Sequence, residues 1–498
     1  MSHSIAIPDR TLTAAARPVA WPENVEAVFS SLARQPGCLW LDSAGGPAHL
    51  ARWSVLAAEP SAVLLYQDGT ARVEPGHFEP AYRPGRFRVS SLPAVAGSAL
   101  SRPFDALGEF LAAVRLEGDE TFPFGPGLYG YLAYDLAPHI EPKAVLSSIA
   151  DIRLPDLWFG LYEAVLLLDH LRHEAFLIGA PGPATAAIEE ALAAPWCAMP
   201  PPAPLARKGR AESACNFSRA AYLEAVARAR DYIAAGDIFQ VNLSRRFSVP
   251  LDGADSPPAR LADLYLRLRR ANPAPYAAYV GLGGGRAVLS SSPELFLDLH
   301  GGRVVTRPIK GTRPLRPGDD AFNRRMREEL LGSEKDRAEL VMIVDLERND
   351  LGRVCSYGSV RVAEPRALEP YAAVHHTVAT VEGRLHPDRG VVDLLKATFP
   401  GGSITGAPKV RAMQIIAELE PTRRSVYTGA VGYLGPRSAQ DPAGRCALNI
   451  AIRTLLADGP RVHLQVGGGI VADSRPEAEF DETTDKARAM LAALGLPA

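Results

Sequence analysis

Short apolar runs separated by glycine and proline are the feature of this 498-residue chain that most constrains its fold. Among the first 200 residues they recur as segments such as 62–66, 128–134 and 161–168, which are typical of β-strands. The clearest helix there spans 184–194, is rich in Ala and Glu, and stops at Pro195. Later strands and amphipathic helices mix without the regular alternation of a doubly wound sheet. The pattern therefore predicts an α+β fold.

A proline-rich stretch divides the chain. Residues 199–204 read Met-Pro-Pro-Pro-Ala-Pro and are followed by basic residues at 207–210, the composition of a linker. We place a boundary near 198–215, between an N-terminal subdomain over 1–200 and a catalytic domain over 213–498. Beyond it we expect a helix from Ser218, its N-cap, to Ala235, and a strand over 239–249.

Composition excludes several classes of protein. The chain has 54 Lys and Arg against 56 Asp and Glu, a net charge of −2, which disfavours a nucleic-acid binder. No apolar run approaches the roughly 18 residues of a membrane span, and the N-terminus lacks the apolar core of a signal peptide, so we expect no membrane contact and a cytoplasmic location. The 5 cysteines are scattered without a CxxC pair, so neither disulfides nor a zinc site is indicated.

A predicted hairpin decides whether Glu294 and Lys310 face each other. Residues 290–312 form two apolar runs that turn at Gly301 and Gly302. With a three-residue loop, Glu294 lies directly across from Lys310, with a Cβ separation of about 4.5–5.5 Å. A two-residue loop places them on opposite faces. An ordinary ion pair on a solvated face is the alternative interpretation.

Two predicted helices each carry an acidic pair at i, i+3 spacing: Asp336 with Glu339, and Glu479 with Glu482. Carboxylates from two helices suit a hard divalent cation such as Mg²⁺, which takes one or two of them and completes its shell with water and substrate oxygen. The alternatives are solvated helix faces and, for Asp336, a capping box with Ser333.

Two glycine-rich segments could receive a ligand. The loop 401–409 enters a helix whose first turn holds Pro408, and free amides at such a helix start can bind a carboxylate. Gly467, Gly468 and Gly469 interrupt a strand pattern, which lets a ligand approach bare backbone.

Read together, these segments resemble the chorismate-utilising enzymes, the family of anthranilate, aminodeoxychorismate, isochorismate and salicylate synthases. The match is dense over 218–494 and thinner before the linker. It rests on six motifs in the family's order: Ser-Pro-Glu at 292–294, Pro-Ile-Lys-Gly-Thr at 308–312, Asp-Leu-Glu-Arg-Asn-Asp-Leu-Gly at 345–352, Gly-Gly-Ser-Ile-Thr-Gly-Ala-Pro-Lys at 401–409, Ala-Ile-Arg-Thr at 451–454 and Asp-Glu-Thr-x-x-Lys at 481–486.

The resemblance implies two facing β-sheets wrapped by helices, with a cleft for chorismate and Mg²⁺. It makes Glu339 and Glu482 the metal ligands, and Asp336 and Glu479 the partners of the metal's water shell. It makes Glu294 the general acid that protonates the departing C4 hydroxyl, and His376 a histidine beside the ring, with its neighbour His375 structural. The substrate-binding residues that it implies are Gly311, Thr312, Ser403, Tyr433, Arg453, Gly467, Gly469 and Lys486.

Two positions indicate the reaction within the family. Members that activate water have Lys where this chain has Gln240, whereas the aminodeoxychorismate synthases have Lys at position 310 and anthranilate synthases usually have Ala. A lysine there can attack C2 as the C4 hydroxyl leaves, and ammonia then displaces it at C4. To attack, Lys310 must be partly deprotonated, which requires desolvation or a cationic neighbour such as Arg307 or the metal to lower its pKa.

We therefore expect a Mg²⁺-dependent conversion of chorismate and ammonia to 4-amino-4-deoxychorismate, for p-aminobenzoate and folate. The alternatives are the anthranilate synthase reaction and a catalytically silent regulatory paralogue. Retention of Glu294, Lys310, Glu339 and Glu482 argues against the silent paralogue. The chain has no Gly-x-Cys-x-Gly elbow for glutamine hydrolysis, so a separate glutamine amidotransferase subunit is the implied source of ammonia.

The N-terminal half resembles the segments that form the family's tryptophan pocket. The matching residues are Ser43, Trp53, Pro273 and Tyr276, while Asp42 departs from the Glu often seen there. Plain core packing of Trp53 and Tyr276 is the alternative interpretation.

Overall fold

The structure is a computed structural model that describes residues 9–43, 45–76, 102–118, 120–147, 149–194, 214–251 and 258–496. The predicted linker at 198–215 lies outside the described residues, apart from its last two positions. No helix in the described ranges is both long and apolar enough to cross a membrane.

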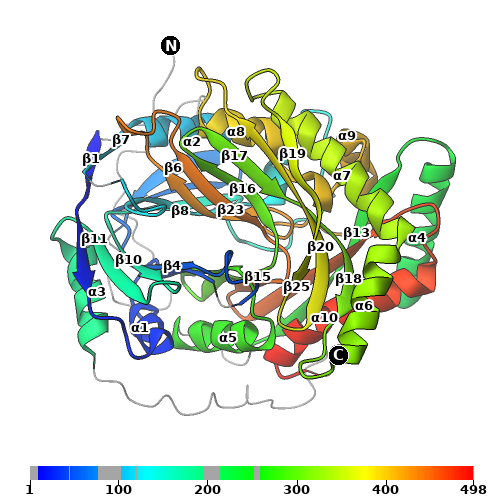
Figure 1. Cartoon of the computed structure of the whole chain (residues 1–498), viewed down its shortest axis with the longest axis horizontal. Helices are drawn as coiled ribbons and strands as arrows, with labels where there is room; N and C mark the ends of the chain where they lie inside the picture. Colours follow the sequence, from blue (N-terminus) through cyan, green and yellow to red (C-terminus); the bar gives the residue numbers. More distant parts are fainter. Residues whose placement is uncertain are drawn as a thin grey trace.

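Two large antiparallel sheets face one another and carry the fold (Figure 1). The first has 12 strands: β2 (Ala16–Val19), β3 (Leu39–Asp42), β4 (Trp53–Ala57), β10 (Ala164–Asp169), β11 (Glu174–Gly179), β12 (Ala214–Cys215), β13 (Gln240–Pro250), β14 (Tyr276–Gly283), β15 (Arg286–Ser292), β21 (Gly406–Ala407), β24 (Thr454–Asp458) and β25 (Arg461–Ile470). The second has 11: β5 (Ala62–Gln67), β6 (Thr70–Pro75), β8 (Gly127–Leu132), β9 (Leu157–Tyr162), β16 (Leu295–His300), β17 (Arg303–Arg307), β18 (Ile309–Pro314), β19 (Arg361–Pro370), β20 (Val374–Arg384), β22 (Ala430–Gly435) and β23 (Arg445–Ile450). A separate parallel pair joins β1 (Arg10–Ala14) to β7 (Val114–Gly118).

Helices wrap the two sheets, as the resemblance implies (Figure 1). The α-helices are α1 (Val25–Leu32), α2 (Pro103–Ala112), α3 (Pro183–Ala193), α4 (Arg219–Ala234), α5 (Pro258–Ala271), α6 (Asp320–Gly332), α7 (Glu334–Gly352), α8 (Val391–Thr398), α9 (Lys409–Leu419) and α10 (Pro476–Ala493), and the short 3-10 turns are η2 (Tyr134–His139) and η3 (Gly402–Ile404). The predicted helices at 184–194 and 218–235 are confirmed as α3 and α4, and Ser218 caps α4 by accepting a hydrogen bond from the Ala221 amide. The predicted strand at 239–249 is β13.

The alternation of side chains along each strand builds two separate layers of core. In β3, Leu39 points into the core between the sheets, where it joins side chains of the second sheet such as Tyr129 and Phe159. Its neighbour Trp40 points the other way, into the core under α1, α3, α5 and α10. Because β14 pairs with β3 and β22 pairs with β8, strands from both sides of the predicted boundary share each sheet.

Two of the places where the chain passes from one sheet to the other form adjacent corners. Pro293 and Glu294 connect β15 of the first sheet to β16 of the second, and residues 451–453 connect β23 back to β24. The corners bond to each other, because the Ile450 amide donates to the Glu294 carbonyl at 3.0 Å. Arg453 sits at the second corner with φ +50°, a left-handed conformation that is uncommon for a residue other than glycine.

Of the two hairpin loops that the sequence leaves open, the structure has the two-residue loop. His300 pairs with Arg303, so the loop contains only Gly301 and Gly302. Both glycines have positive φ, +56° and +75°, as a two-residue hairpin turn of the favoured type requires. Glu294 and Lys310 are therefore not a cross-strand pair, since Glu294 lies at the corner and Lys310 lies in β18, which pairs with β20.

A buried ion pair ties β13 to the segment around η3. The carboxylate of Glu420 accepts hydrogen bonds from Arg424 and from the amide and hydroxyl of Ser244. The Arg424 guanidinium also donates to the carbonyls of Ile404 at 3.0 Å and Asn242 at 2.7 Å. Both charged side chains are almost fully buried, at 2% and 1% exposure.

We predict that Glu420→Ala lowers the free energy of unfolding by about 3–5 kcal/mol, because the change leaves the Arg424 charge buried without its partner. The matched control is Glu418→Ala on α9, whose partner Arg228 is half exposed, with an expected loss of about 1 kcal/mol or less. Urea denaturation of the three proteins measures both values. Equal losses would contradict the assignment of Glu420 as a structural anchor.

Candidate active site

Lys310 lies at the centre of the predicted site residues. Its Nζ donates a hydrogen bond to the Ser403 carbonyl at 3.2 Å. Burial lowers the pKa of Lys310 below its usual value, the carboxylates of Glu339 and Glu294 oppose that shift, and the ammonium of Lys486 adds to it. The predicted desolvation of Lys310 is thus present, but its cationic neighbour is Lys486. Arg307, the side chain predicted for that role, pairs with Glu369 instead.

Glu294 reaches the same place from the corner between the sheets. Its side chain is buried, and burial raises its pKa even though the Ser403 hydroxyl and the positive charge of Lys310 act in the opposite direction. A carboxyl group that keeps its proton more readily than usual is suited to act as an acid. Ser403 therefore touches both Glu294 and Lys310, one through its hydroxyl and the other through its carbonyl.

His376 is buried and electrically neutral in this environment. Burial, together with the charges of Arg453 and Lys486, lowers its pKa to about 3. Its Nδ1 lies 3.0 Å from the Thr312 hydroxyl and 3.4 Å from the Gly311 carbonyl, whereas its Nε2 is buried and has no hydrogen-bond partner among the described residues. Gly311 and Thr312 thus contact the histidine directly.

Two cations stand where the resemblance implies carboxylate binding. Arg453, at the second corner, interacts with Glu294 electrostatically and donates to the Asn272 side chain at 3.4 Å. Lys486 of α10 donates to the Gly467 carbonyl at 2.9 Å and pairs with Glu482 at 2.7 Å.

The four predicted metal-site carboxylates come from α7 and α10 and repel one another. Burial raises the pKa of Glu339, and the charges of Asp336 and Glu482 raise it further. Burial and Glu482 likewise raise the pKa of Glu479. The pKa of Glu482 itself is lowered, chiefly by Lys486. A divalent cation among these groups would relieve the repulsion.

The donor set fits Mg²⁺ better than an ion that needs a cage of protein ligands. Across the described ranges, no three His, Cys, Asp or Glu side chains converge as a ready-made metal site, and Mg²⁺ characteristically takes only one or two carboxylates. Gly468 leaves room beside them, because a Cβ there would lie 3.2 Å from Oε2 of Glu479 and 3.8 Å from Oε1 of Glu482. Asp336 meets Arg313 at 3.2 Å, and its amide is capped by the Ser333 hydroxyl.

The glycines of β25 also leave room for the side chain of Gln240. A Cβ on Gly469 would lie 2.0 Å from Nε2 of Gln240, so only glycine admits that amide. The Gln240 side chain is buried, and its Oε1 has no hydrogen-bond partner among the described residues. In the sequence, Gln240 stands out only as a departure from the lysine of the water-activating members. The structure places it against the glycines of β25.

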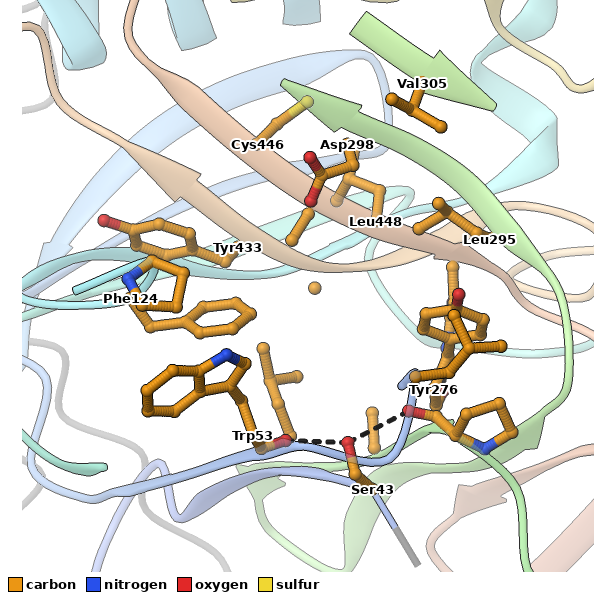
Figure 2. Close-up of a pocket in the computed structure, with 18 of the residues that line it drawn as sticks. Ser43, Trp53, Phe124, Tyr276, Leu295, Asp298, Val305, Tyr433, Cys446 and Leu448 are labelled. Atoms are coloured by element: carbon orange, nitrogen blue, oxygen red, sulfur yellow. Dashed lines mark hydrogen bonds between the residues drawn. The ribbon is translucent and has the colours of Figure 1, made fainter. Parts of the chain in front are cut away.

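Apart from the site around Lys310, a cavity of about 450 Å³ lies between the sheets; we call it the second cavity (Figure 2). Ser43, Trp53 and Tyr276 line it, and the Ser43 hydroxyl donates to the Trp53 carbonyl at 2.7 Å. Tyr433, for which the resemblance implies a place in the chorismate site, also lines this cavity. In β22, the alternate residues Val431 and Tyr433 both face the cavity.

Pro273, which the resemblance implies for the tryptophan pocket, is not among the residues that line this cavity. The proline that lines it is Pro275, whereas Pro273 packs against Gly45. The repeated prolines of Asn-Pro-Ala-Pro-Tyr offered no signal in the sequence to separate the two.

The structure reveals a polar path between the cavity and His376 that the sequence did not indicate. Arg307 lines the cavity and pairs with Glu369. Glu369 also accepts a hydrogen bond from the Tyr371 hydroxyl at 3.3 Å, and the Tyr371 ring packs edge-on against His376, with ring centroids 4.9 Å apart. Glu369 and Tyr371 stand outside the six motifs.

Comparison with known proteins identifies the family of this chain. The model of the chorismate binding enzyme family matches residues 86–492, and the chain belongs to that family. Anthranilate synthase component 1 of Thermus thermophilus is 46% identical over 398 residues, covering 79% of this chain and 82% of its own. Aminodeoxychorismate synthase component 1 of Klebsiella aerogenes is 39% identical over 473 residues, covering 94% and 96%.

Among solved structures, anthranilate synthase component I of Streptococcus pneumoniae TIGR4 has a similar fold, with a TM-score of 0.71 at 31% identity. The similarity covers 88% of this chain and 92% of that one. The predicted α+β architecture of facing sheets wrapped by helices is therefore confirmed.

Proposed function

We propose that this chain is an aminodeoxychorismate synthase component I, which converts chorismate and ammonia to 4-amino-4-deoxychorismate for p-aminobenzoate and folate synthesis. The observation that carries the proposal is Lys310, partly desolvated and placed with the acid Glu294 around Ser403. The anthranilate synthase reaction is the second candidate, because relatives with that name are 44% and 46% identical. Lys310 is the evidence against it.

Each step can be assigned to side chains of this chain. Arg453, Lys486 and the backbone of 467–469 would hold the two substrate carboxylates. The neutral amine of Lys310 attacks C2, the C4–oxygen bond breaks, and Glu294 gives its proton to the departing hydroxyl, which leaves as water. Ammonia then forms a bond to C4, the bond from Lys310 to C2 breaks, and the surplus proton returns to Glu294.

Mg²⁺ is the cofactor that we propose, held by Glu339 and Glu482, with Asp336 and Glu479 bonding its water shell. When bound, it would neutralise and orient a substrate carboxylate. His376 is neutral, and its Nε2 has no hydrogen-bond partner in the described part of the chain, so it would accept or donate one hydrogen bond beside the ring without adding charge. Ammonia would come from a separate glutamine amidotransferase subunit.

The test of the proposed reaction is product identification together with trapping of the lysine adduct. With chorismate, Mg²⁺ and ammonium at alkaline pH, the isolated chain should form 4-amino-4-deoxychorismate, and with glutamine alone it should form no product. Without ammonia, intact-mass analysis should find chorismate minus one water on the peptide containing Lys310. Lys310→Ala should lose the adduct, and Glu294→Gln should form it slowly for want of a proton donor.

Anthranilate as the product would establish the second candidate instead. An unmodified wild-type chain, together with full aminodeoxychorismate formation by Lys310→Ala, would reject the covalent step.

The metal prediction concerns Glu339→Gln and Glu482→Gln. Either change should lower turnover at least about a hundredfold while leaving the fold intact, because a bound cation contributes several kcal/mol of charge stabilisation. Glu328→Gln, on the exposed face of α6, is the matched control and should keep full activity. Steady-state assays with EDTA and with restored Mg²⁺ measure the requirement, and undiminished activity in EDTA contradicts it.

We further propose that the second cavity takes tryptophan, since aromatic side chains of Trp53, Phe124, Tyr276 and Tyr433 line it. Calorimetric titration with L-tryptophan should show one site per chain. Trp53→Ala should weaken binding about tenfold through lost ring contact. Trp21→Ala, outside the cavity and stacked on His173, should bind like the wild type. Absence of binding to the wild type would leave Trp53 and Tyr276 as core packing.

A further inference from the structure

Glu347 is a buried acid that neither the proposed chemistry nor the metal site uses. It lies on α7, more than two turns beyond Glu339, and is 3% exposed. One carboxyl oxygen, Oε1, accepts a hydrogen bond from the Gly402 amide at 3.0 Å. The other, Oε2, is buried and has no hydrogen-bond partner among the described residues.

The loop that Glu347 holds contains the residue shared by the two reacting side chains. Ser403 follows Gly402 directly, and it contacts Lys310 through its carbonyl and Glu294 through its hydroxyl. The loop is seated closely on α7, because a Cβ at Gly402 would lie 2.7 Å from Cδ2 of Leu346 and 3.0 Å from Oε1 of Glu347. A small movement at Gly402 would therefore reach both Lys310 and Glu294.

We propose that Glu347 is a positioning residue, which fixes the Gly402 amide and thereby sets Ser403 between Lys310 and Glu294. The inference rests on the proposed function for what those two residues do. Glu347 does not touch the reacting atoms, so it acts only through the loop.

The surroundings of Glu347 favour its neutral form. The groups that face it are Asp350 from the same helix, Lys409 from the start of α9, the Gly402 amide and, from the sheet corner, Glu294. Burial raises its pKa, the charges of Asp350 and Glu294 raise it further, and Lys409 opposes them. A neutral carboxyl still accepts from Gly402 and adds no negative charge beside Glu294. Ionisation at alkaline pH would bury an unpaired charge behind the loop.

Three variants separate positioning from bulk stability. Glu347→Gln keeps an oxygen acceptor for Gly402 and is neutral at every pH, while Glu347→Ala removes the acceptor. Glu382→Gln is the matched control, a buried carboxylate of β20 that is bonded to Arg303 and Arg361. Chorismate consumption with Mg²⁺ and ammonium gives kcat and KM for each protein across pH, whichever product forms.

We expect Glu347→Gln to keep kcat within about twofold, and Glu347→Ala to lose about tenfold in kcat with KM for chorismate unchanged, the effect of one lost hydrogen bond on the chemical step. As pH rises, the wild type should lose activity through ionisation of Glu347, and that loss should be absent from Glu347→Gln. An Ala variant with wild-type kcat, or a Gln variant as impaired as the Ala variant, would overturn the proposal.

Hydrogen exchange gives a readout that does not depend on activity. Peptides covering 399–408 should exchange faster in Glu347→Ala than in the wild type, while Glu347→Gln and Glu382→Gln should match the wild type. If the wild type forms no aminodeoxychorismate but this exchange pattern holds, the proposed function fails and the role of Glu347 in the loop stands. Unchanged exchange in Glu347→Ala rejects that role.

Discussion

The two adjacent sheet crossings are the constraint on which the site depends. A strand that stays within one sheet buries or exposes its side chains by strict alternation, whereas a residue at a crossing is free of that pattern. Glu294 stands at one crossing and Arg453 at the other, and backbone hydrogen bonds between the crossings fix their separation. The Ser292 hydroxyl strengthens the link by donating to the Ile450 carbonyl at 2.6 Å. Main-chain hydrogen bonds thus fix the backbone positions of the acid Glu294 and the cation Arg453. Motion of the two side chains has little influence on those backbone positions.

Helix α7 is the second element on which the site depends, because it carries one acidic pair at each end of the site. Asp336 and Glu339 face α10, while Glu347 and Asp350, two and three turns further on, hold the 401–409 loop through Gly402 and Lys409. The carboxylate of Glu339 raises the pKa of Lys310, whereas burial lowers it. Burial prevails, so Lys310 is easier to deprotonate than a free lysine even beside the carboxylates of the proposed metal site.

Features that depend on motif order and residue periodicity could be predicted from the sequence. The direction in which a side chain of a fully buried strand points could not. The helix of Glu479 and Glu482 and the N-cap Ser218 followed from residue spacing, whereas the two-sheet architecture followed from the family resemblance. The facing of Tyr433 could not be predicted, because every residue of β22 is buried and alternation carries no polar signal to show which cavity a side chain faces. The hairpin register needed the conformations of Gly301 and Gly302, and the partner of Arg307 needed Glu369, a residue 62 positions away.

Several buried polar atoms have no hydrogen-bond partner among the described residues. A buried donor or acceptor without a partner costs about 1–3 kcal/mol, so a fold retains few unless a ligand completes them. Within the described part of the chain, buried atoms of Gln240, Asn242 and His376 lack partners, and they surround the glycine strand and the corner of Arg453. By contrast, Arg307, Glu369 and Tyr371, which lead towards the second cavity, are bonded to one another. A polar substrate bound beside His376 and the glycine strand would supply hydrogen bonds that these atoms lack among the described residues.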